Sequence, residues 1–188
     1  TNAIIGMTSH EGYAIYTKKF SFGYSTTLRS PLLDAMGVRF VTGNKKMFNM
    51  PPHYKRAYTD GRFHRTVWEN IRAFPRAWSV TNVIAVDNID AAEAVLRGSM
   101  DLRSSVVIER PTAQMLASRN SGSSSVRLKE FGFNRQSYTV VAPSDTILVT
   151  SDLPYPGWHA YVGDTRTEIR PANVAMRAIA IPRGKHTV

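Results

Sequence analysis

The last third of the chain alternates apolar and polar residues over short runs that turn-forming residues separate. This two-residue period is typical of half-buried β-strands, and a spacing of roughly ten residues between runs is typical of antiparallel sandwiches. The runs cover residues 126–131, 137–142, 146–150, 158–162, 167–170 and 176–181. We therefore predict an antiparallel β-sandwich in this part of the chain. Trp158 follows the break at Pro156-Gly157, so we expect this residue at a corner of the sandwich and largely buried.

The first 112 residues mix short helical and strand patterns. Ser30-Pro31 predicts the start of a helix, residues 90–97 place apolar side chains at helical spacing, and Asp60-Gly61 between them indicates a β-hairpin. We predict an α/β portion at residues 1–112, an exposed loop rich in Ser at 113–125, and the sandwich portion at 126–188. The two portions are expected to form one structural unit. The predicted fold class is mainly β, of the α+β type.

The composition indicates a folded chain with a basic surface. Of 188 residues, 43% are hydrophobic and 20% are charged, as in globular domains. No window approaches the roughly 20 apolar residues that a membrane-spanning helix requires. The formal net charge of +10 suits nucleic acid, phospholipid headgroups or a phosphorylated substrate, with a solvated basic surface as the alternative. Nucleic acid ranks last, because the chain lacks the RNA-binding aromatic signature and any helix-turn-helix pattern.

Motifs of common catalytic and cofactor sites are missing from the sequence. The chain has no cysteine, which excludes disulfides, thiolate catalysis and most structural zinc sites. The five histidines do not show metalloprotease spacing, and neither glycine-rich phosphate loops nor Gly-x-Ser-x-Gly occur. We therefore expect no metal, no cofactor and no catalytic residue here. Glu69 and Asp152 are the first acids to test against that expectation.

Aromatic residues with cations nearby are the remaining chemical signal. Aromatic faces suit sugar rings, and arginine binds phosphate with two donors at once. The candidate carbohydrate-binding residues are Tyr155, Trp158 and Tyr161 in one group and Trp68, Asn70 and Arg76 in another. The alternative is that the tryptophans Trp158 and Trp78 are packing anchors. We favour packing for Trp158, because the preceding Pro-Gly forms a corner that needs filling.

Several short motifs occur in a fixed order along the chain. They are Gly12-Tyr13, residues 30–41, Val67-Trp68-Glu69-Asn70, residues 73–78, Tyr155-Pro156-Gly157-Trp158, Val162-Gly163-Asp164, Asn173, residues 177–181, Pro182-Arg183-Gly184 and residues 186–188. In this order they resemble the carboxy-terminal extracytoplasmic domain of bacterial YfhO-type membrane proteins, which belong with multi-spanning glycosyltransferases that use lipid-linked sugars. Two departures are Ala14, where an acidic residue is common, and the order Val-Gly-Asp instead of Val-Asp-Gly. The second departure changes which turn residue must take a positive φ.

This resemblance implies a function in the cell envelope. It implies a non-catalytic domain on the extracytoplasmic face of the cell membrane, which helps to cover or complete a lipid-linked sugar or acceptor site. The parent protein would be glycosyltransferase-like and would contain the membrane helices outside this segment. The implied partners are that membrane-spanning part, anionic lipid and a lipid-linked sugar. The alternative is a free-standing carbohydrate-binding module, which a row of exposed aromatics on one sheet face would favour and buried tryptophans would oppose.

Overall fold

The computed structural model describes residues 28–44, 50–62, 64–98, 100–116 and 124–188, and it is mostly β with a few short helices. The predicted fold class, mainly β of the α+β type, is confirmed. The chain divides into two compact units, Thr1–Ala73 and Phe74–Val188, which we call unit 1 and unit 2. The motif Gly12-Tyr13 and the neighbouring Ala14 fall outside the described residues.

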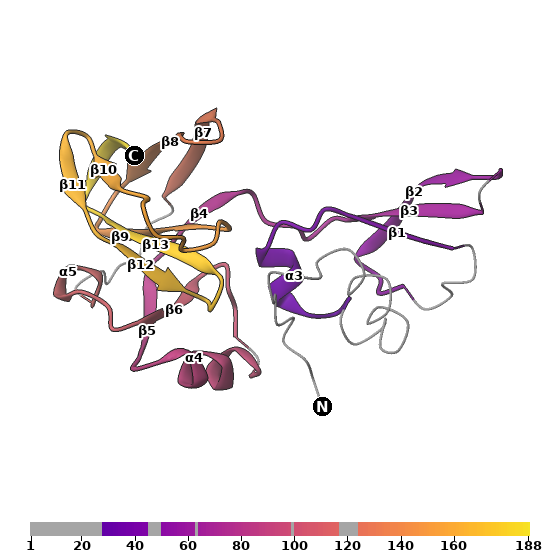
Figure 1. Ribbon diagram of the computed structural model, residues 1–188, viewed down its shortest axis with the longest axis horizontal. Coiled ribbons are helices and arrows are strands. Elements are labelled where there is room, and N and C mark those ends of the chain that lie inside the picture. The colour runs from indigo at the N-terminus through magenta and orange to yellow at the C-terminus, as the bar shows by residue number, and fades with distance from the viewer. Residues whose placement is uncertain (1–27, 45–49, 63, 99, 117–123) are drawn as a thin grey trace. The chain divides into compact units, whose positions relative to one another are not determined.

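The described residues of unit 1 form a three-stranded antiparallel sheet, in the strand order β1-β3-β2, and one short helix (Figure 1). Its described elements are α3 (Pro31–Ala35), β1 (Phe40–Asn44), β2 (Tyr54–Asp60) and β3 (Arg65–Asn70). The helix begins as predicted, since the Ser30 hydroxyl accepts a hydrogen bond from the Leu32 amide at 3.3 Å. The predicted hairpin also forms, but Asp60 pairs with Arg65. Four residues therefore turn the chain, rather than a two-residue Asp-Gly turn.

Unit 2 contains a six-stranded sheet, a three-stranded sheet and a two-stranded hairpin (Figure 1). Its described elements are β4 (Ala77–Val80), β5 (Asn82–Val86), α4 (Ile89–Leu96), β6 (Ser105–Glu109), α5 (Ala113–Leu116), β7 (Ser125–Phe131), β8 (Gln136–Ala142), β9 (Thr146–Thr150), β10 (Ala160–Val162), β11 (Thr165–Thr167), β12 (Ile169–Ala172), β13 (Met176–Ile181) and β14 (Gly184–Thr187). The large sheet has the order β4-β9-β13-β12-β6-β5. Its β5–β6 pair is parallel and is joined through α4, and its other pairs are antiparallel.

The core of unit 2 lies between the sheets. Apolar side chains of β4, β9 and β13 meet those of β8 and β10, and most of them are less than 7% exposed. The cluster comprises Ala77, Tyr138, Val140, Ala142, Leu148, Ala160, Val162, Ile179 and Ile181. Strands β9 and β13 are buried along their whole length. Those two strands are therefore the rigid support for the loops that follow them.

The observed boundary between the units differs from the sequence expectation. The sheet of unit 2 takes β4, β5 and β6 from the predicted α/β portion 1–112 and β9, β12 and β13 from the predicted sandwich portion 126–188. The division comes after Ala73 instead. The predicted exposed loop 113–125 also begins with α5, whose Met115 is 1% exposed. The cause is long-range pairing, such as β4 with β9, which local composition does not encode.

The C-terminal strands form, but they are distributed over three different sheets. Strand β11 pairs with β10, whereas β12 begins two residues later and joins the large sheet between β13 and β6. Strand β14 leaves β13 and pairs with β8 in the three-stranded sheet. The expected single strand over 167–170 is therefore two strands in different sheets. No described helix is long and apolar enough to cross a membrane.

Candidate functional site

The candidate site in unit 2 is built around the loop between β9 and β10, residues 151–159, which we call the PGW loop. Two prolines and Gly157, at φ 94°, make its bend, a conformation that favours glycine. The loop is tied down where it begins, because the Ser151 amide and hydroxyl both donate to the Arg76 carbonyl, at 2.9 and 3.3 Å. Its middle is open, with Tyr155 73% exposed. The fold thus presents this loop on the edge of a fully buried strand.

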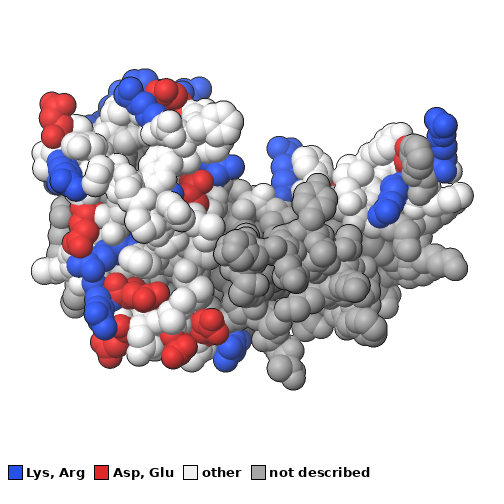
Figure 2. Space-filling view, viewed as in Figure 1, with Lys and Arg blue, Asp and Glu red and all other residues white. Residues whose placement is uncertain are grey.

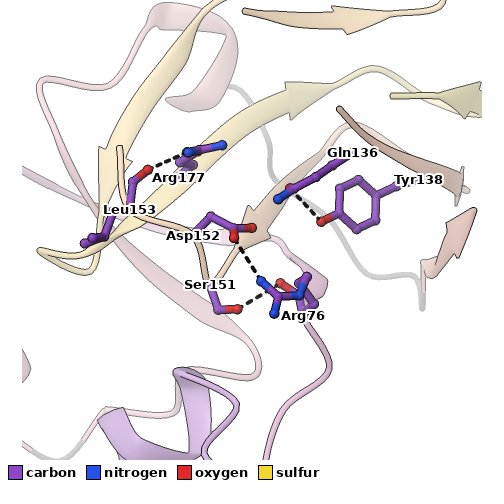
Figure 3. Close-up of polar contacts among 7 residues, drawn as sticks. All are labelled: Arg76, Gln136, Tyr138, Ser151, Asp152, Leu153 and Arg177. Atoms are coloured by element: carbon purple, nitrogen blue, oxygen red, sulfur yellow. Dashed lines mark hydrogen bonds and ion pairs between the residues drawn. The ribbon is translucent and has the colours of Figure 1, made fainter. Parts of the chain in front are cut away.

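Arg177 of β13 contacts the PGW loop through a hydrogen bond and through packing of its side chain. Its Nε donates to the Leu153 carbonyl at 2.7 Å (Figure 3). Its guanidinium carbon also lies 4.4 Å from the ring centroid of Trp158. Burial lowers the pKa of Arg177, and the negative charge of Asp152 opposes that shift. A guanidinium stays protonated in proteins. The loop therefore packs against the buried guanidinium of Arg177, which lies over the Trp158 ring.

A second guanidinium lies at the exposed edge of the same site. Arg76 Nη1 donates to Asp152 Oδ1 at 2.9 Å, and the Arg76 side chain remains 41% exposed (Figure 3). The Arg76 guanidinium also covers the ring of Phe131, with its carbon 4.2 Å from the centroid. The other Asp152 oxygen, Oδ2, is buried without a hydrogen-bond partner among the described residues. Two cations and one carboxylate therefore leave the site with a net positive charge.

Tyr138 of β8 completes the polar cluster. Its hydroxyl donates to Gln136 Oε1 at 3.1 Å (Figure 3). Burial, and then the charge of Asp152, raise the pKa of Tyr138 to about 12, against the effect of Arg76 and Arg177. The phenol is therefore a neutral hydrogen-bonding group at physiological pH. The cluster offers donors and aromatic faces, and its one carboxylate is engaged in an ion pair.

The structure brings together some of the predicted site residues. Trp158, Tyr155 and Arg76 all belong to the PGW loop or to the cluster beneath it. Trp158 follows the bend at Gly157 and is only partly exposed, which agrees with the expectation of a largely buried residue at a corner. Its ring covers a buried arginine instead of filling an apolar corner. Tyr161 is 50% exposed and belongs to β10, the strand that follows the loop.

Trp68 and Asn70 belong to unit 1 and have structural contacts there. Asn70 is 1% exposed, and its amide donates to Asp34 Oδ1 at 2.7 Å and to the Val38 carbonyl at 3.1 Å. Its Oδ1 accepts from the Arg72 amide at 3.0 Å. Trp68 is half-buried and packs on the small core of unit 1. These contacts occupy the polar atoms of Asn70 and favour a packing role for both residues.

Sequence reasoning missed Arg177, Tyr138, Gln136 and Phe131. Arg177 had a usable signal, because it is the one charged residue in the run Met176–Ile181, whose six residues are all buried. A charge in such a run requires partners. Tyr138 and Phe131 sit in ordinary alternating strands. Their part in the site depends on tertiary placement that the local pattern does not contain.

A separate groove of about 550 Å³ lies elsewhere in unit 2. It is lined by α5, the β10–β11 hairpin, and residues of β13 and β14. Its polar lining includes Arg166, Glu168 and His186. Arg166 contacts His159 Nδ1 at 2.9 Å, and Glu168 forms an ion pair with Arg170 at 2.7 Å. The residues the structure describes contain no group of three or more potential metal ligands.

Comparisons with protein-family models, with curated proteins and with solved structures found no match. The resemblance to YfhO-type domains therefore stays a prediction from sequence motifs.

Proposed function

We propose that this chain is a non-catalytic extracytoplasmic domain of a polytopic, glycosyltransferase-like membrane protein. It helps to cover or complete the site for a lipid-linked sugar or its acceptor. The membrane-spanning part of the same protein is its partner, and the sugar-carrying lipid phosphate is its ligand. The PGW loop with its two arginines is the observation that carries this proposal. The motif Tyr155-Pro156-Gly157-Trp158, on which the family resemblance largely depends, forms that loop.

The chemistry of the PGW loop fits a phosphorylated sugar. Arg76 keeps 41% of its side chain exposed beside Phe131, and Tyr155 projects from the bend of the loop. A guanidinium can bind a phosphate through parallel hydrogen bonds. An exposed aromatic ring can pack on the apolar face of a sugar. Both kinds of contact are available within one segment of unit 2.

The acids of the chain support a binding role over a catalytic one. Glu69 and Asp152, the two acids that the sequence singled out, each form an ion pair with an arginine, at 3.0 and 2.9 Å. A general acid or base must present its carboxylate to the substrate, and an arginine already engages each of these two carboxylates. We therefore assign glycosyl transfer to the rest of the parent protein.

A free-standing carbohydrate-binding module is the second candidate. Exposed aromatics in unit 2 favour it, namely Phe131, Phe133, Tyr155 and Tyr161. The tryptophans oppose it, because Trp78 is 8% exposed and donates its indole N–H to the Leu102 carbonyl at 3.0 Å. Trp158 is occupied on one face by Arg177. The two candidates differ in whether the lipid phosphate contributes to binding.

Binding measurements separate these functions. The chain is titrated against a prenyl-phosphate-linked hexose in neutral-lipid nanodiscs and against the same free hexose. We expect binding only to the lipid-linked form, and an increase in its Kd of about fivefold in Tyr155→Ala, equivalent to about 1 kcal/mol. Tyr58→Ala is the matched control, since Tyr58 is 61% exposed in unit 1. Equal affinity for the free hexose favours the carbohydrate-binding module, and no effect of Tyr155→Ala refutes the assignment of the loop.

A further inference from the structure

The hairpin that joins β7 and β8 ends in two exposed phenylalanines. Phe131 is the last residue of β7 and is 54% exposed, and Phe133 in the turn is 101% exposed. The turn is closed by a hydrogen bond from the Gly132 amide to the Arg135 carbonyl at 2.8 Å. Phe133 thus projects from a defined turn. Its ring contributes nothing to the core, which makes a role outside the fold the natural explanation.

Contacts inside unit 2 fix the hairpin beside the PGW loop. The Arg76 guanidinium lies over the Phe131 ring and pairs with Asp152, the second residue of that loop. The ion pair is 2.9 Å long, and the Asp152 side chain is 17% exposed. The tip of the hairpin and the candidate binding loop are therefore held together by one bridging arginine.

The charges around the tip are mostly positive. Arg127, Lys129 and Arg135 are exposed, and Glu130 is the single acid between them. Glu130 and Arg135 are both more than half exposed and lie 3.5 Å apart, so they form a weak ion pair. Figure 2 shows Lys and Arg side chains gathered over the part of unit 2 where β7 and β8 lie in Figure 1. The tip therefore has an exposed apolar end, and most of the charged side chains around it are basic.

We propose that the β7–β8 tip inserts Phe133 and Phe131 into the headgroup region of an anionic bilayer. Aromatic rings are favoured at the membrane interface, and nearby Lys and Arg are attracted to anionic headgroups. A turn that protrudes from the surface is better suited to enter a deformable bilayer than to fill a preformed pocket of another protein. The inference rests on the proposed function in one respect: insertion would hold the PGW loop at the level of lipid phosphates. The β7–β8 tip is the membrane contact of that same site.

Vesicle binding tests this inference without any sugar lipid. The whole chain is mixed with phosphatidylglycerol–phosphatidylcholine vesicles, and the bound fraction is measured by flotation at low and physiological salt. We expect several-fold weaker binding at the higher salt and about tenfold weaker binding in Phe133→Ser at either salt. Phe40→Ser is the matched control, because Phe40 is 53% exposed in unit 1. Both variants should keep the melting temperature of the parent chain.

Depth of insertion gives an independent measurement. The fluorescence of Phe133→Trp should be quenched by lipids brominated in the acyl chains, whereas that of Phe40→Trp should change little. Equal binding to neutral and anionic vesicles, or unchanged binding in Phe133→Ser, overturns the proposal, and so does a chain that binds no vesicle. A chain that binds vesicles but no lipid-linked hexose refutes the proposed function and leaves the membrane contact intact. The reverse result refutes the membrane contact alone.

Discussion

Asn173 shows how one side chain fixes the turn between β12 and β13. It is 2% exposed and takes a φ of 46°. Its side-chain Oδ1 accepts from the Val107 backbone N–H at 3.0 Å, and its own backbone N–H donates to the Val107 carbonyl at 2.9 Å. Asparagine tolerates the left-handed region better than most residues. The residue therefore joins this turn to the middle of β6.

Asn173→Ala should lower the free energy of unfolding by about 2–4 kcal/mol, because it leaves the buried Val107 N–H unpaired and places alanine in the left-handed region. Asn173→Gly removes the same hydrogen bond without the conformational cost, so it should be less destabilising by about 1 kcal/mol. Urea denaturation measures both. Equal stability of the alanine variant and the parent chain would contradict this account of the turn.

Tyr138 makes stability depend on alkaline pH. Its pKa is raised to about 12 from the ordinary value of 10.0. Between these values the unfolded chain loses the proton more readily than the folded chain. The stabilisation that protonated Tyr138 contributes is therefore fully present below pH 10. It is lost as the pH rises toward 12, which lowers the free energy of unfolding by about 2 kcal/mol. Denaturation at several pH values should show a shallower decline in Tyr138→Phe than in the control Tyr161→Phe. Parallel declines would count against a buried phenol.

At the scale of single residues, the sequence indicated only part of the candidate site. Tyr155, Trp158 and Arg76 were visible as aromatics near cations. That Trp158 covers Arg177, 19 positions along the chain, follows from the packing of a loop on β13, and no local pattern contains it. Asn70 was chosen for its neighbours in the sequence, but its side chain faces Asp34 and Val38. Side-chain direction at such positions is decided by tertiary contacts.

At the scale of elements, strand positions were predictable and strand partners were not. The runs at 146–150 and 176–181 coincide with β9 and β13, because alternation and β-branched residues mark a strand locally. The helix expected at 90–97 is α4, which Asn88 caps by accepting from the Ala91 amide at 2.9 Å. The parallel β5–β6 pair and the move of β14 to another sheet depend on contacts between distant residues.

Substitution of Gly163 tests the backbone conformation of the turn in the β10–β11 hairpin. It takes a φ of 61°, and Asp164 is not among the residues with positive φ, so the first turn residue alone needs the left-handed region. An added Cβ would meet nothing within 4 Å at Gly163 or at Gly61, and Gly61 lies outside that region. Gly163→Ala should therefore lower the free energy of unfolding by about 1–2 kcal/mol. Gly61→Ala should leave it unchanged or raise it by less than about 1 kcal/mol. Equal effects of the two changes would be inconsistent with this turn.

At the scale of the molecule, unit 2 contains the described partners of all its strands. Strands β4 to β14 pair only with one another among the described residues, and the cluster between the sheets draws on unit 2 alone. The sequence predicted the β-rich fold but placed the division near residues 113–125. The Ser-rich composition there marks a surface segment, and composition does not reveal that β4 and β9 are neighbours.

A chain of residues 74–188 should consequently fold alone. We expect a β-type circular dichroism spectrum and one cooperative thermal transition, because the core cluster and the pairings of the six-stranded sheet are retained. Amide exchange should be slowest in β9 and β13, which are fully buried. A spectrum of an unfolded chain would contradict the assignment of unit 2 as an independent body.

Chemical-shift mapping tests the central claim most directly. The amide spectrum of the isotope-labelled chain is recorded while a soluble, short-chain prenyl-phosphate hexose is added. The proposed function predicts the largest shifts at residues 151–159, with the side chains of Arg76 and Arg177 also perturbed, and little change in the groove lined by Arg166, Glu168 and His186. Shifts that centre on that groove or on unit 1, or a spectrum that does not change at saturating ligand, would contradict the assignment of the PGW loop as the binding site.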